Sequence, residues 1–168
     1  VRRETEGVRR YVHLGTGNYD ERTAKAYVDL SYFTSRKEVG ADMAAFFNLL
    51  TGYSEPPDWS HLVVAPIGLR RHVLSEIEKT RKAAGRGQAA RIIIKTNALI
   101  DAEVITALCK ASTEGVDVTL LVRGPCGLQV GLPGFSENIK VRVIIDRFLE
   151  HARVLYFGRG DKSRVYIT

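Results

Sequence analysis

The spacing of apolar positions is most regular in the second part of the chain. Short apolar runs at residues 62–65, 91–95 and 118–122 predict buried strands. Between them, residues 69–84 and 101–113 carry apolar side chains at helical spacing, and the second of these segments begins at an aspartate suited to capping. The order strand, helix, strand, helix, strand predicts parallel pairing in an α/β sheet with helices covering its faces.

The pattern in the first part of the chain predicts shorter elements. Residues 1–7 look like a hairpin turn leading into a strand at residues 8–13, so we expect a partner strand before residue 1. The elements predicted next are a helix at about residues 20–27, a strand at residues 28–34 and a helix at residues 36–51. Gly52 is a suitable end for the last helix, and its apolar spacing places Phe46 and Phe47 in the core.

A linker and a terminal hairpin complete the predicted organisation. Residues 53–60, with two prolines and two serines, read as the linker. Residues 153–157 and 164–168 predict two strands joined by residues 158–163. Because strand pairing is interrupted at both ends, we interpret the chain as a fragment of a longer protein.

Composition narrows the class of protein. The 168 residues suffice for one ordinary domain or two partial ones, and a hydrophobic content of 45% permits a core. No apolar run approaches the roughly 18 residues that cross a membrane, and the charged residues 1–6 do not resemble a signal peptide. Cys109 and Cys126 lack metal-ligand spacing, so we expect a reduced, cytoplasmic protein.

Positive charge is concentrated in the second part of the chain. Residues 1–61 hold 8 Lys and Arg against 9 Asp and Glu, whereas residues 62–168 hold 17 against 10. An excess of seven positive charges indicates an anionic partner for that part. A solvated basic surface is an equally good explanation of the charge alone.

Candidate chemistry is densest between residues 120 and 157. The predicted strand at residues 118–122 ends in Arg123 and a loop with four glycines and two prolines, and a second apolar strand is predicted at residues 141–145. The titratable residues directly after it are Arg147, Glu150, His151 and Arg153. Because ligands bind beyond the carboxyl ends of strands in α/β sheets, this arrangement predicts a site for an anion.

A second candidate is the glycine-containing turn at residues 13–20. Its glycines free backbone N–H groups, and Thr16 and Asn18 add side-chain donors, which together resemble an anion cradle. A Gly-x-Gly segment is more often an ordinary turn, and His13 at the end of a strand is more often structural. His61 and His72 are expected at the surface, and Cys126 has no base within reach in the sequence.

Several of these motifs resemble the long-form bacterial polyphosphate kinases. The blocks that carry the resemblance, in the same order as in the family, are residues 13–19 (His-Leu-Gly-Thr-Gly-Asn-Tyr), 23–29 (Thr-Ala-Lys-Ala-Tyr-Val-Asp), 121–126 (Leu-Val-Arg-Gly-Pro-Cys), 133–139 (Pro-Gly-Phe-Ser-Glu-Asn-Ile) and 147–153 (Arg-Phe-Leu-Glu-His-Ala-Arg). The family enzyme reversibly transfers the terminal phosphate of ATP to inorganic polyphosphate through a phosphohistidine. The resemblance therefore implies a phosphotransferase.

The same resemblance implies a fold and a division into domains. Two phospholipase-D-like domains, each a mixed or parallel sheet flanked by helices, form the carboxyl-terminal region of these kinases. Residues 1–61 would then end the first domain, and residues 62–168 would form most of the second. The turn at residues 15–18 is similar to the Gly-Ser/Thr-x-Asn turn of that fold, and residues 151–153 resemble its His-x-Lys motif with Arg in place of Lys.

Carried over by position, the resemblance assigns roles to three residues, and the turn at residues 13–20 adds two candidates of its own. Tyr27 would pack near the nucleotide, Arg123 would contact phosphate, and His151 would be an acid/base and phosphate-binding residue. Thr16 and Asn18 would contribute phosphate-binding donors from the turn. The phosphorylated histidine of the family would lie before residue 1, so His13 is not the nucleophile, and the 168 residues alone should be inactive.

The implied ligands are ATP or ADP, inorganic polyphosphate and Mg²⁺, and the sequence identifies no metal ligands. The implied protein is a cytoplasmic homo-oligomer without a transmembrane segment or a specific nucleic-acid partner, and peripheral membrane association stays open. Two alternatives also remain: a phospholipase-D-type phosphodiesterase or nuclease, and a non-enzymatic polyanion-binding module. The Arg in the His-x-Lys position disfavours the first alternative, and the lack of aromatic residues interleaved with basic ones disfavours nucleic-acid binding.

Overall fold

The structure is a computed structural model, and it describes residues 1–52, 55 and 58–168. The described chain forms two compact units of unequal length, and each unit is built from two separate segments of the chain. The first unit comprises Val1–Leu14 and Ser31–Leu69, and the second comprises Gly15–Leu30 and Arg70–Thr168. Residues 53, 54, 56 and 57 of the predicted linker lie outside the described residues.

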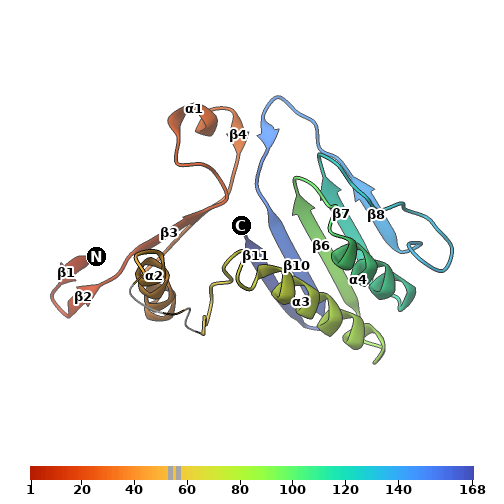
Figure 1. Cartoon of the computed structure of the whole chain (residues 1–168), viewed down its shortest axis with the longest axis horizontal. Coiled ribbons are helices and arrows are strands. Elements are labelled where there is room, and N and C mark those ends of the chain that lie inside the picture. The colour runs from red at the N-terminus through yellow and green to blue at the C-terminus, as the bar shows by residue number, and fades with distance from the viewer. Residues whose placement is uncertain (53–54, 56–57) are drawn as a thin grey trace. The chain divides into compact units, whose positions relative to one another are not determined.

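A five-stranded mixed sheet is the centre of the second unit (Figure 1). Its strands, in spatial order, are β11 (Lys162–Ile167), β10 (Val154–Arg159), β6 (Ala90–Thr96), β7 (Asp117–Val122) and β8 (Ile139–Arg142). The neighbours β6, β7 and β8 are parallel, whereas β10 is antiparallel to both β6 and β11. This arrangement confirms the predicted mixed α/β sheet.

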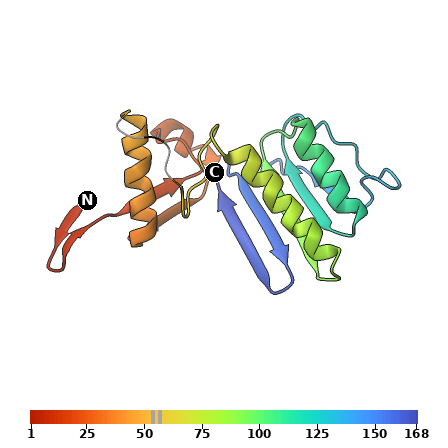
Figure 2. The same ribbon diagram turned by 60° about the horizontal axis from the view of Figure 1, so that its bottom comes forward.

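Two helices, α3 (Leu69–Ala84) and α4 (Ala102–Thr113), lie on one face of this sheet (Figure 2). On β7 the side chains alternate, so that Val118, Leu120 and Val122 are buried beneath the helices. The Asp101 carboxylate accepts hydrogen bonds from two backbone amides of the first turn of α4, which confirms the predicted cap. The core between sheet and helices also contains Ile77, Ile92, Ile94, Leu108 and Phe157.

Residues 15–30 join the second unit through a very short strand pairing. Helix α1 (Glu21–Ala24) is capped by Asp20, but it ends before the expected Tyr27. Strand β4 (Tyr27–Val28) follows and pairs in parallel with β9 (Leu149–Glu150). The helix is shorter than its sequence indicated because the backbone around Tyr27 is used for this pairing.

In its described residues, the first unit contains two small strand pairs and one helix. Strand β1 (Arg2–Glu4) pairs with β2 (Gly7–Arg9), and β3 (Val12–Gly15) pairs with β5 (Ser31–Thr34). The partner strand expected before residue 1 is therefore supplied by β1 within the chain. Helix α2 (Lys37–Leu50) occupies its predicted position and ends beside Gly52, whose φ of 78° suits glycine.

Three predictions about this fold were wrong. Residues 62–65 form no strand, because the buried Asp42 carboxylate binds the backbone N–H groups of residues 60–62 and no strand lies alongside them. The strand predicted at residues 141–145 is instead β8, which ends at Arg142 and leaves Ile145 87% exposed. Of the aromatic pair on α2, Phe47 is 57% exposed rather than in the core, while Phe46 packs on Trp59.

Candidate functional site

The candidate site is centred on an aspartate–histidine pair within the second unit. The Nδ1 atom of His151 lies 2.9 Å from Oδ1 of Asp29, although the two residues are 122 positions apart in sequence. The side chain of His151 is only 12% exposed and that of Asp29 21% exposed. The pair forms because the backbone N–H of His151 bonds to the carbonyl of Val28, which extends the β4–β9 pairing by one residue.

The glycine-containing turn fixes the other side of Asp29. The Thr16 hydroxyl donates a hydrogen bond of 2.7 Å to Asp29 Oδ1 and accepts one of 3.0 Å from the backbone N–H of Leu30. A Cβ atom on Gly17 would lie 2.5 Å from Asp29 Oδ2, so glycine is required here for close approach of the backbone. The turn therefore holds the carboxylate that orients the histidine.

The other edge of His151 faces a cation and an aromatic ring. An NH1 group of Arg153 lies 3.3 Å from His151 Nε2 and also donates to the His151 carbonyl at 3.2 Å. The Tyr27 ring packs on the imidazole with centroids 4.9 Å apart. This geometry fits the tautomer in which Nδ1–H donates to Asp29 and Nε2 carries the lone pair.

The electrostatics of Asp29 follow from these contacts. Burial raises the pKa of the Asp29 carboxyl, but hydrogen bonds from Thr16 and His151 and the positive charge of Arg153 together lower this pKa by more. The net pKa of Asp29 therefore lies below its ordinary value of 3.8. Asp29 is thus a carboxylate at neutral pH. A buried carboxylate on Nδ1 is the arrangement that stabilises positive charge on a histidine during proton transfer.

A cleft at the carboxyl ends of β6 and β7 contains the predicted phosphate ligand Arg123. Lys95 donates a 2.6 Å hydrogen bond to Glu150, the residue immediately before His151. Both line the cleft together with Arg123, which follows the last residue of β7. The amino end of β10 shares this rim, because Val154 pairs with Lys95.

The structure thus shows where each predicted site residue lies. Tyr27, Thr16 and His151 belong to one contact network, whereas Arg123 lies in the adjoining cleft and the side chain of Asn18 is exposed. Sequence reasoning did not select Asp29 or Lys95, and it named Arg153 without giving it a role of its own. A usable signal existed for Asp29, because the two-residue strand period places it on the same side as Tyr27.

The remaining histidines are distributed differently from the prediction. His61 is exposed, as expected. His72 is not a simple surface residue: its ring packs edge to face on Tyr166, its Nε2 atom is buried, and burial lowers its pKa. His13 lies in the first unit with its ring against Phe33.

The described part of the chain does not bring candidate ligands for a metal ion together. Within residues 1–52, 55 and 58–168, no group of three or more His, Cys, Asp or Glu side chains could hold a metal ion. In the same residues, Asp29 and Glu150 are already engaged by Thr16, His151 and Lys95. The donor set of the described residues does not fit a resident Mg²⁺ ion.

Comparison with known proteins decides the family. The model of polyphosphate kinase C-terminal domain 2 matches residues 62–168, and that of C-terminal domain 1 matches residues 1–56. The chain belongs to the polyphosphate kinase family. It is 49% identical over 167 residues to a polyphosphate kinase of Thermosynechococcus vestitus, covering 99% of the chain and 23% of that relative. A polyphosphate kinase of Mycolicibacterium gilvum is 48% identical over 96% of the chain and 22% of the relative.

A solved structure of this family confirms the fold. The crystal structure of the polyphosphate kinase from Porphyromonas gingivalis matches with a TM-score of 0.88 and 36% sequence identity, over 95% of this chain and 26% of that one. The chain therefore spans about a quarter of the length of the polyphosphate kinases it matches. No described helix is long and apolar enough to cross a membrane.

Proposed function

We propose that the chain contributes a histidine-centred site to a kinase that reversibly transfers the terminal phosphate of ATP to inorganic polyphosphate. The observation that carries the proposal is the chain of contacts Asp29–His151–Arg153. A carboxylate orients the imidazole through Nδ1, and a guanidinium lies beside the free nitrogen. This combination can bind a phosphate oxygen and exchange a proton with it.

Phosphoryl transfer explains why such a site would be useful. The γ-phosphorus loses its bond to the bridging oxygen of ATP, whose electron pair leaves with ADP, and forms a bond to the incoming nucleophile. Charge builds up on the phosphate and bridging oxygens as that bond breaks. In our proposal Arg153 and Arg123 bind these oxygens, and His151 Nε2 in its protonated form donates a proton to the leaving oxygen.

The nucleophile belongs outside these residues. The resemblance implies a phosphohistidine before residue 1, and the terminal oxygen of polyphosphate then attacks its phosphorus, breaks the P–N bond and regenerates the histidine. We therefore propose that the 168-residue chain alone does not make polyphosphate. Incubation with γ-labelled ATP should leave no acid-labile label on it, and labelling of His13 would contradict the assignment.

Two further features of the parent protein are part of the proposal. Residues 1–61 and 62–168 belong to two phospholipase-D-like domains, an arrangement supported by the separate family matches at residues 1–56 and 62–168. The parent protein is cytoplasmic, uses Mg²⁺–ATP as its substrate and acts without a specific nucleic-acid partner.

The test is a pair of substitutions at His151 in the complete protein. We expect His151→Ala to lower turnover in ATP-dependent polyphosphate synthesis by roughly 100-fold or more. His151→Gln keeps a hydrogen-bond donor but carries no titratable proton, so it separates proton transfer from hydrogen bonding. A glutamine variant with full activity would leave a hydrogen-bonding role alone, and an alanine variant with full activity would overturn the proposal.

Two measurements complete this experiment. His61→Ala is the control, because that histidine is exposed and lies outside the site, and its turnover should stay within twofold of the parent value. Nuclease and phosphodiesterase activity should be measured on the same preparations. Activity there that depends on His151, without polyphosphate synthesis, would assign the site to the phospholipase-D-type chemistry instead.

A further inference from the structure

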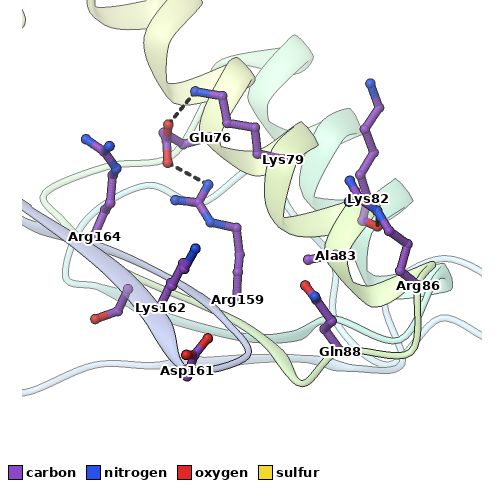
Figure 3. Close-up of a pocket in the computed structure, with 11 residues that line it drawn as sticks. Glu76, Lys79, Lys82, Ala83, Arg86, Gln88, Arg159, Asp161, Lys162 and Arg164 are labelled. Carbon is purple, nitrogen blue, oxygen red and sulfur yellow. Dashed lines mark hydrogen bonds and ion pairs between the residues drawn. The ribbon is translucent and has the colours of Figure 1, made fainter.

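A basic groove lies at the opposite end of the sheet from the His151 site. It has a volume of about 880 Å³ and is bordered by α3, the loop after it and the β10–β11 hairpin (Figure 3). The lining residues include the cations Lys79, Lys82, Arg86, Arg159, Lys162 and Arg164 and the carboxylates Glu76 and Asp161. Six positive and two negative groups give the groove a formal excess of four positive charges.

The periodicities of two elements produce this concentration of charge. On β11, Lys162 and Arg164 alternate with outward residues and so point to the same face of the sheet, the one that α3 covers. Arg159 is the register partner of Lys162 across the hairpin and shares that face. On the helix side, Lys79 and Lys82 are three residues apart on α3, and Arg86 lies in the turn that follows it. Two rows of cations therefore border one groove.

A buried carboxylate fixes part of the groove and leaves the rest available. Glu76 is 2% exposed and accepts hydrogen bonds from Lys79 at 2.8 Å and from Arg159 at 2.9 Å. Among residues 1–52, 55 and 58–168, no carboxylate forms an ion pair with Lys162 or Arg164. Glu76 thus orients two cations, Lys79 and Arg159, at the floor of the groove. The other two cations of the hairpin, Lys162 and Arg164 (the hairpin row), remain unneutralised and exposed.

We propose that this groove binds a distal segment of a linear polyphosphate chain while the chain end is at the His151 site. The cations that line the groove, of which Lys162 and Arg164 have no carboxylate partner in the described chain, suit an extended anion with regularly repeated charge better than a single phosphate. None of the described lining residues is aromatic, so the groove offers no stacking surface for nucleic-acid bases. The identity of the anion rests on the proposed function, whereas the groove itself does not.

The distance between the two sites sets a length requirement. The groove includes Arg159, the register partner of Ala90 at the start of β6, whereas Lys95 near the end of β6 belongs to the cleft beside His151. The seven residues of β6 span about 20 Å. Only a chain long enough to cover this distance gains from the groove, so short acceptors should be insensitive to it.

The test is a double substitution of the hairpin row in the complete protein. Lys162→Ala/Arg164→Ala should weaken equilibrium binding of long-chain polyphosphate by about tenfold, because two charge-assisted contacts are lost. Binding of tripolyphosphate should change less than twofold. In the kinase assay the variant should show a raised KM for long acceptors with an unchanged kcat. Arg159 is left intact, because its removal would leave buried Glu76 with one partner fewer.

The matched control lies on the other edge of the same sheet. Lys140 and Arg142 on β8 are also exposed and two residues apart, and neither lines the groove. Lys140→Ala/Arg142→Ala removes the same charge and should leave long-chain binding within twofold of the parent value. An equal loss in both variants would show a net-charge effect and overturn the proposal. An unchanged hairpin variant with a normal melting temperature would overturn it as well.

Competing anions separate the remaining outcomes. Single-stranded oligonucleotides and poly-glutamate of matched charge should compete poorly for the groove. If either one bound more tightly than polyphosphate and lost that binding in the hairpin variant, it would replace polyphosphate as the occupant.

The proposal for the groove and the proposal for the His151 site can be rejected independently. Loss of long-chain binding in the hairpin variant with full activity of His151→Ala would reject the His151 mechanism and keep the groove, and the reverse pattern would reject the groove alone.

Discussion

Two carboxylates at opposite ends of one sheet show how the same chemistry serves different purposes. Asp29 and Glu76 each pair with basic side chains, and for both residues burial raises the pKa while hydrogen bonds and nearby charges lower it to a net value below the ordinary one. Asp29 contacts a histidine whose other nitrogen faces Arg153, whereas Glu76 contacts two cations that solvent reaches. The difference predicts that Asp29 matters for activity and Glu76 for stability.

The contrast extends to the surroundings of each carboxylate. Around Asp29, the contacts with Thr16 and His151 fix the positions of a few groups, as a reaction requires. Near Glu76, Lys162 and Arg164 of the hairpin are left without carboxylate partners in the described chain and form a surface of repeated charge. The surroundings of Asp29 therefore fix the geometry of a few groups, whereas the surroundings of Glu76 provide electrostatic attraction for an anion.

The largest effect that would test the comparison of Asp29 with Glu76 is a loss of turnover on substitution of Asp29. Asp29→Asn keeps the size of the side chain but removes the charge that stabilises a protonated His151. We expect turnover in the complete protein to fall by roughly 10- to 100-fold, with little change in KM for ATP. Because Asp29 acts through His151, which must be protonated to donate its proton, the alkaline limb of the turnover profile should move to lower pH. A variant with lower turnover and an unmoved profile would reduce Asp29 to a structural role.

A smaller effect, on stability, is expected at Glu76. Glu76→Gln removes the charge from a carboxylate that is 2% exposed, and we expect the free energy of unfolding in urea to fall by about 1–3 kcal/mol. Turnover should stay within twofold. Long-chain polyphosphate should bind at least as tightly as before, since the groove loses a negative charge.

Glu78 provides the control for this substitution on the same helix. It also pairs with two cations, Arg81 and Lys82, and hydrogen bonds from Arg81 lower its pKa to about 2. Its side chain is 44% exposed, however, so solvent screens these pairs. Glu78→Gln should therefore change stability by only about 0–1 kcal/mol. Equal losses at the two positions would mean that burial does not set the difference.

The smallest effect is a pH dependence with a defined sign. The pKa of Glu76 is lower in the folded protein than its ordinary value of 4.5, so its contribution to stability is present above pH 4.5. That contribution is lost as the pH falls through the folded pKa. The difference in unfolding free energy between the parent and Glu76→Gln should therefore shrink below pH 4.5. A difference that grows in acid would contradict the assignment.

The sequence predicts the regular elements of the second unit closely, because their signals are local. Helix α3 spans Leu69–Ala84 in both the prediction and the structure, and Asp101 caps α4 as expected. The strand at residues 62–65 fails because an apolar run does not reveal whether a neighbouring strand exists. Asp42, 20 positions before Leu62, takes the backbone donors instead.

The site was only partly predictable for a related reason. Tyr27 and His151 were selected through motif resemblance, but the pairing that brings them together has two residues on each strand and therefore no periodic pattern. Asp29 stood in a quoted motif without a role, since its partner lies 122 residues away. The excess positive charge of residues 62–168 is visible in the sequence, but it does not locate the groove. The groove is located only by the alternation of side chains on β11 in the structure.

The separation of Asp29 from His151 has a consequence for synthesis on the ribosome. At about 5–20 residues per second, the 122 residues from Leu30 to His151 take roughly 6–24 s to emerge. During that interval the edge of β4 has no partner from β9, and the Thr16–Asp29 contact can form locally while the imidazole is still missing. The site is therefore assembled only after the parallel strands β6, β7 and β8 have been made.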